Sequence, residues 1–273
     1  VKLAKKISAL GGPASGWQGA EIISADSRQV YKGLDIGSGK VPCDKKNPRN
    51  RKLEAKSYFH KGIPHHLLDV VNPKKIFTVK QFKKLAQNKI KEIQKRGNLP
   101  IICGGSGFYI QAVVDNISLP EVEPNIQLRK NLEKKSIEDL GKILKKLDAK
   151  RFKTIAAKNP RRLIRAIEIA KTLGKVPKLK KNKNAKIIQI GIEISNTELK
   201  IKIKKRLFLR IKKGMVKEVK SLHATGLSWK RLENLGLEYR YVALYLQGKI
   251  SKKEMIEKLK SEIWKYAKRQ RTW

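Results

Sequence analysis

One short apolar run that ends in glycines constrains the fold of this chain more than any other feature. Residues 99–103 (Leu-Pro-Ile-Ile-Cys) predict a buried strand, and residues 104–107 (Gly-Gly-Ser-Gly) follow it directly. An amphipathic helix predicted over 79–95 leads into this strand. Another short strand, predicted over 21–25, ends at Asp26. The order strand, helix, strand, with glycines after a strand, is typical of a parallel, doubly wound α/β sheet.

The sequence pattern changes between residues 119 and 184. This stretch carries prolines, many charges and helical periodicity but no strand signal, so we predict a helical insertion over 119–184. The α/β core is then expected to comprise residues 1–118 and 185–273. The other predicted elements are helices over 1–10, 197–223 and 252–271 and strands over 66–71 and 186–193, the last of which returns the chain to the sheet.

Positive charge is the outlying bulk property. The 273 residues include 65 Lys and Arg against 23 Asp and Glu, which gives a formal net charge of +42. Such an excess attracts polyanions, so it favours a nucleic-acid partner. A Lys-rich genome would account for part of the excess. Charge alone does not separate RNA from DNA or from an acidic membrane surface.

Cysteine usage and hydropathy narrow the class of protein. The two cysteines, Cys43 and Cys103, stand in unrelated contexts and do not have metal-ligand spacing. So few cysteines disfavour a disulfide scaffold and fit a reducing cytoplasm. No apolar run approaches the roughly 18 residues that a membrane span needs, and no signal peptide is recognisable. We therefore expect a soluble cytoplasmic protein with no membrane partner. Because the first residue is Val1 and a helical pattern begins at once, we expect a fragment.

Two loops at the predicted strand ends carry candidate chemistry. In parallel sheets, active sites form outside the carboxyl ends of the strands. Residues 26–29 (Asp-Ser-Arg-Gln) place a carboxylate there that can accept a proton from an amine. An aspartate that only caps the next turn is an equally good interpretation. The glycines of 104–107 let the backbone approach a ligand or cradle an anion, and a plain tight turn fits them as well.

Two apparent phosphate-binding loops do not meet the chemical requirement of such a loop. The motif G-x-x-x-x-G-K-[S/T] needs its Lys on the phosphates and its hydroxyl on Mg²⁺. Residues 11–16 match the glycine spacing, but Trp17 and Gln18 stand where Lys and Ser or Thr belong. Residues 37–40 (Gly-Ser-Gly-Lys) are followed by Val41. We reject both loops, so no diphosphate-binding loop is identified.

Three histidines lie close together in the sequence. His65 and His66 are adjacent, and His60 is nearby. Adjacent side chains of an extended segment point to opposite faces, so they rarely share one metal ion. A structural or substrate-contacting role is therefore favoured over a zinc site, and no metal ligand is assigned.

Two helical segments concentrate cations beside an apolar stripe. Arg161 and Arg165 are four residues apart and share one face of a helix, and the segment has only one acid, Glu168, to pair with its three arginines. Guanidinium groups bind phosphates in a bidentate manner, so this ladder suits a nucleic-acid backbone. A surface ion-pair helix is the alternative. The last predicted helix is likewise basic at its end, through Lys265, Lys268, Arg269 and Arg271, which the helix dipole explains only in part.

Seven segments of the chain carry a resemblance when they are taken in order. They are 21–37 (EIISADSRQVYKGLDIG), 64–69 (PHHLLD), 104–109 (GGSGFY), 161–165 (RRLIR), Arg206 with Gly214, 235–240 (LGLEYR) and 266–273 (YAKRQRTW). Together they resemble the tRNA dimethylallyltransferase family, also called the tRNA isopentenyltransferase or IPP transferase family. Each motif alone is modest, but seven in the same order over nearly the whole chain argue against chance.

The resemblance implies a fold and an activity. Family members have a P-loop NTPase-like parallel sheet flanked by helices, with a helical tRNA-binding insertion. They transfer a dimethylallyl group from its diphosphate to the exocyclic amine of the adenosine 3′ of the anticodon. The implied substrates are tRNA, bound through its anticodon stem-loop, and dimethylallyl diphosphate, with Mg²⁺ as cofactor. The target base is flipped out of its stack. We expect a monomeric enzyme.

The resemblance also implies roles for individual residues. Asp26 would accept the proton or hydrogen of the adenine amine. Ser106, where the family usually has Thr, would hydrogen-bond near the diphosphate or the target base, and Arg206 would neutralise the leaving diphosphate. The expected tRNA contacts are Asp26, Ser27, Arg28, Gln29, Arg161, Arg162, Leu163, Ile164, Arg165, Lys268 and Arg269.

The chain departs from the family pattern at its front. The family carries a strand and a phosphate-binding loop before its first helix, and residues 1–10 resemble that helix. We therefore expect the loop upstream of Val1 and further basic residues beyond Trp273. Residues 12–18 resemble an insertion before the next strand. The alternative is a catalytically inactive tRNA-binding fragment of the family. A small-molecule kinase is disfavoured, because the phosphate-binding lysine is missing and the arginine ladder would be unexplained.

Overall fold

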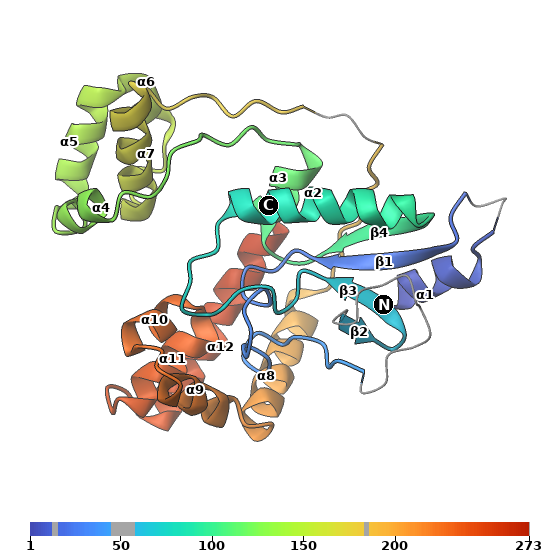
Figure 1. Ribbon diagram of the computed structural model, residues 1–273. Coiled ribbons are helices and arrows are strands. Elements are labelled where there is room, and N and C mark those ends of the chain that lie inside the picture. Colours follow the sequence, from blue (N-terminus) through green and yellow to red (C-terminus); the bar gives the residue numbers. More distant parts are fainter. Residues whose placement is uncertain (13–15, 45–57, 183–185, 273) are drawn as a thin grey trace. The chain divides into compact units, whose positions relative to one another are not determined.

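The computed structural model describes residues 1–12, 16–44, 58–182 and 186–272 (Figure 1). The chain forms two compact units. Val1–Val114 and Ala185–Trp273 together make the first unit, and Asp115–Asn184 makes the second. The helical insertion was predicted over 119–184, so the second unit begins slightly earlier in the chain than the sequence pattern suggested.

The first unit is built on a four-stranded sheet with the order β2-β3-β1-β4. β1 (Gly19–Ser24) runs parallel to both of its neighbours, β3 (Ile63–His66) and β4 (Asn98–Cys103). β2 (Tyr58–His60) is antiparallel to β3, so the sheet is mixed. Every residue of β1 is buried, as expected for a central strand covered on both faces. β1 and β4 confirm two of the predicted strands.

Helices cover both faces of this sheet (Figure 1). α1 (Lys2–Ala9) packs on one face, in a cluster that includes Ile22 of β1. α2 (Val79–Lys95) and α3 (Gly107–Val114) pack on the other face, in a cluster that includes Ile23. Neighbouring residues of a strand point to opposite faces, so these two isoleucines join the sheet to its two helical layers. α1 and α2 confirm two of the predicted helices.

The structure has a strand over residues 63–66 instead of the strand predicted over 66–71. β3 ends at His66, and the chain then turns, with φ values of 62° at Leu67 and 55° at Asp69. Left-handed φ values are incompatible with an extended strand. The prediction is therefore wrong. Leu67 and Leu68, whose apolar pattern suggested the strand, bury their side chains from a bend instead.

Five helices of the described chain complete the first unit around a second apolar core. The helix predicted over 197–223 is interrupted at Gly214, whose φ of 99° ends one helix and begins the next. Val30 and Leu34 are buried in the same core, which fixes the segment after β1 against these helices. The five helices are α8 (Asn196–Lys212), α9 (Met215–Ala224), α10 (Trp229–Asn234), α11 (Leu237–Leu246) and α12 (Lys252–Arg271), the last of which was predicted with these bounds.

The strand predicted over 186–193 does not form. These residues have no regular secondary structure, and the side chains of Ile188, Ile190 and Ile192 are 90%, 74% and 89% exposed. A strand needs a neighbour for its backbone hydrogen bonds. The segment is not among the strands of the sheet that the structure describes. The prediction is wrong because an apolar pattern alone does not supply a pairing partner.

The described residues of the second unit contain four helices and no strand. Their apolar faces meet in one cluster, to which α5 contributes Leu140 and Leu144 and α7 contributes Leu163 and Ile167. Each helix begins after a side chain that accepts a hydrogen bond from a backbone amide of the first turn, which satisfies a donor that the helix itself leaves open. These caps and helices are Asn125 for α4 (Ile126–Glu133), Ser136 for α5 (Ile137–Leu147), Asp148 for α6 (Ala149–Thr154) and Asn159 for α7 (Pro160–Leu173).

Candidate functional site

Asp26 lies directly beyond the carboxyl end of β1, as the sequence predicted. Its Oδ1 accepts hydrogen bonds from the backbone amides of Arg28 at 2.7 Å and Gln29 at 3.3 Å. The aspartate therefore caps the following turn, which was one of the two interpretations. Both of these bonds fall on the same oxygen. Because Asp26 is only half-buried, Oδ2 can still accept from a ligand. The structure is therefore compatible with a proton-accepting role for Asp26 in addition to its capping role.

Ser106 lies beside Asp26, because the loops that follow β1 and β4 are hydrogen-bonded to each other. The backbone amide of Ser27 donates to Ser106 Oγ at 2.9 Å, and the amide of Ser106 donates to the carbonyl oxygen of Ala25 at 3.1 Å. A Cβ atom on Gly104 would lie 2.2 Å from that carbonyl oxygen, so only glycine fits there. The two candidate loops thus form one site at adjacent strand ends.

The end of α12 closes one side of this site. Gln270 Nε2 donates to the carbonyl oxygen of Gly105 at 3.0 Å, and the Tyr266 hydroxyl donates to it at 3.4 Å. Lys268 and Arg269, both predicted to contact tRNA, are exposed on the same helix turns. The Arg269 guanidinium carbon lies 6.0 Å from the centre of the Tyr266 ring.

The remaining predicted residues of the first loop have structural bonds as well as partial exposure. Arg28 Nη1 donates to the carbonyl oxygen of Asn234 at 3.4 Å. Gln29 Oε1 accepts from the Ser24 hydroxyl at 3.2 Å. Ser27, Arg28 and Gln29 are all half-buried, so each presents part of its surface to a ligand near Asp26.

Cations from α8 and an acid from α11 form a charged cluster near the same loop. Arg210 Nη1 donates to Glu238 Oε1 at 2.8 Å and to the carbonyl oxygen of Gly37 at 3.1 Å. Burial raises the pKa of Glu238, and the nearby Asp26 charge adds to this effect against the influence of Arg210. The pKa of Arg206 is lowered, first by loss of hydration and then by Arg210. Sequence reasoning found Arg206 and missed Arg210 and Glu238.

The lysine of the rejected loop at 37–40 has a structural role. Lys40 is buried, and its Nζ forms ion pairs with Asp35, at 2.6 Å, and with Asp69. The same nitrogen donates to the carbonyl oxygen of Tyr31 at 3.1 Å. Two carboxylates and a carbonyl bind this ammonium group, so Lys40 holds its own loop to Tyr31 and Asp69.

The adjacent histidines do not share a ligand. His66 Nε2 lies 2.6 Å from Glu21 Oε2, whereas His65 Nδ1 lies 2.9 Å from the carbonyl oxygen of Ile63. Among the residues that the structure describes, no group of three or more His, Cys, Asp or Glu could hold a metal ion. Glu21 also accepts from Arg96, at 2.9 Å to each oxygen, and from Asn98 at 2.8 Å.

The predicted arginine ladder of α7 divides into two kinds of residue. Arg161 and Arg162 are exposed at the start of the helix. Arg165 instead donates to Glu168 and, at 2.8 Å, to the carbonyl oxygen of Val122. Glu168 also binds Arg129, through bonds of 2.9 and 2.7 Å.

Two further predicted tRNA contacts on α7 belong to the apolar core of the second unit. Leu163 and Ile164 are both buried, where they pack against residues of α4 and α5. Their side chains hold the helix in place, so any contact with a ligand would be through neighbouring residues. The burial of Leu163 and Ile164 follows from the spacing of the apolar stripe, which the sequence pattern had indicated.

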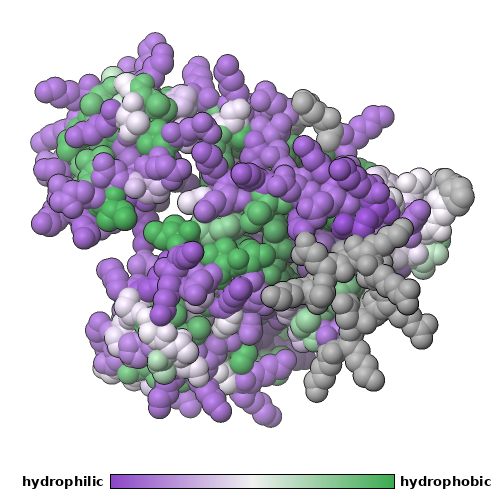
Figure 2. Space-filling model, viewed as in Figure 1, coloured by the Kyte–Doolittle hydropathy of each residue, from purple (hydrophilic) through white to green (hydrophobic). Residues whose placement is uncertain are grey.

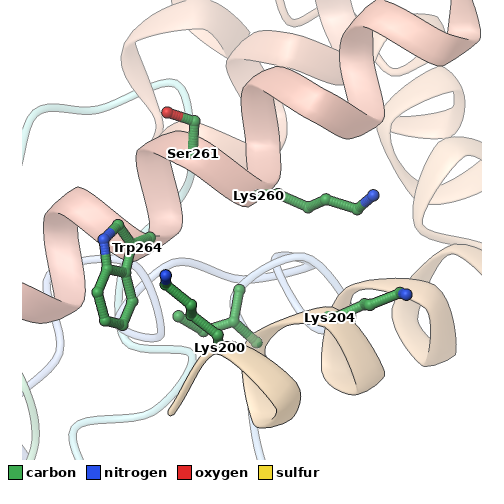
Figure 3. A pocket seen from close by; sticks show the side chains of 6 residues that line it. Lys200, Lys204, Lys260, Ser261 and Trp264 are labelled. Carbon is green, nitrogen blue, oxygen red and sulfur yellow. The ribbon is translucent and has the colours of Figure 1, made fainter. Parts of the chain in front are cut away.

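A groove outside the predicted site lies between α8 and α12 (Figure 3). It has a volume of about 310 Å³ and is lined by Lys200, Ile203, Lys204, Lys260, Ser261 and Trp264. Lys200 Nζ lies 5.2 Å and Lys268 Nζ 5.5 Å from the centre of the Trp264 ring.

The visible surface of the molecule is largely hydrophilic (Figure 2), in keeping with the excess of Lys and Arg. Among the described helices, none has the length and hydropathy that crossing a bilayer requires.

Comparison with known protein sequences places these features in context. Residues 29–273 match the family model described as IPP transferase. The chain is 40% identical over 256 residues to tRNA dimethylallyltransferase 1 of Syntrophus aciditrophicus. This match covers 93% of this chain and 80% of that protein. It is 37% identical over 273 residues to tRNA dimethylallyltransferase 1 of Geotalea uraniireducens, and this match covers 100% of this chain and 82% of that protein.

Solved structures agree with the sequence comparison. The tRNA isopentenylpyrophosphate transferase of Bacillus halodurans matches with a TM-score of 0.64 and 31% identity, over 100% of this chain and 80% of that one. A eukaryotic dimethylallyltransferase acting on tRNA matches with a TM-score of 0.67 at 22% identity, over 100% and 65%, which bears on the fold alone. The predicted P-loop NTPase-like α/β fold with a helical insertion is confirmed by these neighbours.

Proposed function

Because the chain belongs to the IPP transferase family, we propose that it is a tRNA dimethylallyltransferase. It transfers a dimethylallyl group from dimethylallyl diphosphate to the exocyclic amine of the adenosine 3′ of the anticodon in tRNA. The observation that carries this proposal is the junction of the Asp26 and Ser106 loops at the carboxyl ends of adjacent parallel strands. Active sites of parallel sheets form at such strand ends.

Asp26 is proposed to take the proton that the amine loses. The reaction forms a bond between the exocyclic nitrogen and C1 of the dimethylallyl group while the bond from C1 to the diphosphate oxygen breaks. The backbone amides of Arg28 and Gln29 hold Asp26 Oδ1, so the carboxylate has a fixed orientation and Oδ2 is the accepting oxygen. A positioned base of this kind contributes on the order of 100- to 10,000-fold in rate.

Cations and a hydroxyl are proposed to stabilise the departing diphosphate. Negative charge grows on it as the bond breaks, and Arg206, with Arg210 nearby, supplies positive charge. Ser106 Oγ accepts from the amide of Ser27, so its own hydrogen is free to be donated to a phosphate or to the base.

Mg²⁺ is proposed to enter with the diphosphate. In proteins this ion keeps several waters and binds through one or two carboxylates together with substrate phosphates. When bound, Mg²⁺ would neutralise part of the negative charge of the diphosphate.

The tRNA is proposed to bind through exposed cations of both units. In the first unit these are Lys268 and Arg269, together with the exposed parts of residues 27–29. In the second unit they are Arg161 and Arg162. Contacts of this kind go to phosphates and position the RNA without reading its sequence.

We also propose a cytoplasmic location, which the free thiols of Cys43 and Cys103 support. The monomeric state remains a prediction.

An assay of the full gene product tests this function. The protein is incubated with tRNA that lacks the modification, dimethylallyl diphosphate and Mg²⁺, and the digested nucleosides are analysed by mass spectrometry. We expect prenylated adenosine from the wild type and a loss of at least about 100-fold from Asp26→Ala. The tRNA affinity of this variant should stay nearly unchanged, because the carboxylate acts on the amine rather than on phosphate.

Other outcomes of the same assay would contradict the proposal. A large loss of tRNA affinity with intact turnover would show that Asp26 binds RNA rather than taking the proton. Tight tRNA binding without any product from the wild-type protein would favour the alternative of an inactive tRNA-binding protein.

A further inference from the structure

Tyr266 of α12 places an aromatic ring at the edge of the site formed by the Asp26 and Ser106 loops. Its hydroxyl donates to the carbonyl oxygen of Gly105 at 3.4 Å, and Gln270 donates to the same oxygen at 3.0 Å. Gly105 directly precedes Ser106, whose hydroxyl accepts from the backbone next to Asp26. The tyrosine is therefore fastened by its polar end to the loop that carries the site.

The same side chain combines a hydrogen-bonded hydroxyl with partial exposure to solvent. Tyr266 is 39% exposed. The pKa of its hydroxyl is raised, first by burial and then by the charge of Asp26, while Arg28 acts in the opposite direction. The Arg269 guanidinium carbon lies 6.0 Å from the ring centre. A core aromatic would be buried as a whole, whereas Tyr266 is bonded through its hydroxyl and stays partly exposed near the Asp26 loop.

We propose that the Tyr266 ring is the platform on which the target adenine stacks, a role that rests on the proposed transfer to adenosine in tRNA. A base that an enzyme modifies has to leave the stack of its neighbours, and stacking on an aromatic side chain replaces part of the lost interaction. A purine lying on this ring would be next to Asp26, which takes the proton of its amine. Arg269 beside the ring supplies a cation for an adjacent phosphate.

Phe108 provides a competing ring that the test has to separate from Tyr266. It lies two residues after Ser106, at the start of α3, and is 45% exposed. Its side chain has no polar group, so no hydrogen bond can fasten it to the Ser106 loop as the hydroxyl fastens Tyr266. The fixed ring is the better platform, because less side-chain freedom is lost when the base binds.

A fluorescent RNA distinguishes these rings without relying on activity. The probe is an anticodon stem-loop RNA with 2-aminopurine in place of the target adenosine. This base lacks the amine that is prenylated, and its emission is quenched when it stacks. With the full gene product, we expect the Tyr266→Leu complex to be brighter than the wild-type complex, and Tyr266→Phe to keep most of the quenching.

Kinetics with unmodified tRNA give a second readout. Tyr266→Leu should raise the KM for tRNA by about tenfold, within the range known for loss of one base–aromatic stacking contact. The KM for dimethylallyl diphosphate should not change, and Tyr266→Phe should restore most of the tRNA affinity. Tyr245→Leu is the matched control, because it removes a tyrosine ring that packs against the apolar core formed by α8 to α12. It should change neither the emission nor the KM for tRNA.

Three results would overturn the proposal. Equal emission and equal KM in Tyr266→Leu and the wild type would show that no base stacks on this ring. Equal losses in Tyr266→Phe and Tyr266→Leu would assign the effect to the hydroxyl. A change seen only in Phe108→Leu would move the platform to Phe108. If the wild type bound the RNA but made no product, the proposed function would fail while the emission would still decide the stacking role.

Discussion

β1 has a carboxylate near each of its ends, and the two carboxylates are used in opposite ways. Glu21, near the amino end, is 1% exposed, and both of its oxygens accept from charged or polar side chains. Asp26, just past the carboxyl end, is half-buried, and its bonds to two backbone amides fall on one oxygen. The first carboxylate is saturated by the protein, whereas the second is oriented by the protein and remains open to a ligand.

The environments of these two carboxylates explain their different chemistry. Burial alone would raise the pKa of Glu21, but the bonds from His66, Arg96 and Asn98 lower it to about 2. Such a group stays ionised and holds β1 to the strands on either side of it, through His66 on β3 and Asn98 on β4. A group that takes a proton during a reaction needs an oxygen without such partners. The difference therefore separates a structural carboxylate from a candidate catalytic base near the two ends of β1.

Glu21→Gln should produce the largest effect on stability. The substitution removes a buried negative charge and leaves the Arg96 guanidinium without its counter-ion, so we expect the free energy of unfolding to fall by about 3 kcal/mol. Urea denaturation followed by circular dichroism measures this change. Asp26→Asn is the matched control, because an amide oxygen can cap the same turn, and it should lose less than about 1 kcal/mol. Equal destabilisation by both substitutions would break the comparison.

Acid should reveal the same network in the wild-type protein. The pKa of Glu21 in the folded state is about 2, below the ordinary value of 4.5. The unfolded chain therefore takes up this proton first as the pH falls, so the stability from Glu21 is present above pH 4.5 and is lost towards pH 2. We expect a loss of about 3 kcal/mol over this interval.

The difference between two proteins isolates the contribution of Glu21 to the acid response. Other carboxylates, including Glu168 and Asp148, also have lowered pKa values. The free energy of unfolding is therefore measured against pH for the wild type and for Glu21→Gln, and the two curves are subtracted. We expect the difference to shrink as the pH falls through the interval. A difference that stays constant down to pH 2 would contradict the assignment.

The local sequence pattern correctly predicted those helices whose first and last residues are determined by nearby residues in the chain. The helices predicted over 79–95 and 252–271 have these bounds in the structure, where each begins at a capping box built from its own first residues. The strand predicted over 66–71 failed because the left-handed backbone at Leu67 and Asp69 leaves no trace in hydropathy. The strand over 186–193 failed because strand pairing is a non-local event.

The same limit applies to the site. Asp26 and Ser106 were predicted from their place after two parallel strands, a rule that depends on topology. Arg210 and Glu238 were missed because their ion pair joins residues 28 positions apart, on different helices. A signal for Arg210 did exist, since it follows Arg206 by one helical turn on α8. Glu238 lies within the matched segment 235–240, but nothing local identified its partner.

Two arginines of α7 extend the distinction between saturated and open charges to the second unit, with smaller expected effects. Arg165 donates to the buried Glu168 and to the carbonyl oxygen of Val122, so Arg165→Gln should lower the free energy of unfolding by about 2 kcal/mol. Arg162 is exposed, so Arg162→Gln should leave stability nearly unchanged.

Binding of tRNA at several salt concentrations completes this last comparison. If Arg162 contacts a phosphate, its loss should weaken binding by about fivefold and reduce the slope of log affinity against log salt by about one. Arg165→Gln should keep the wild-type slope wherever the protein remains folded, because its guanidinium is bound by Glu168. Filter binding from low to high salt measures both slopes. A reduced slope for Arg165→Gln with an unchanged slope for Arg162→Gln would reverse the assignment, since it would mean that the anchored arginine, and not the exposed one, contacts the RNA.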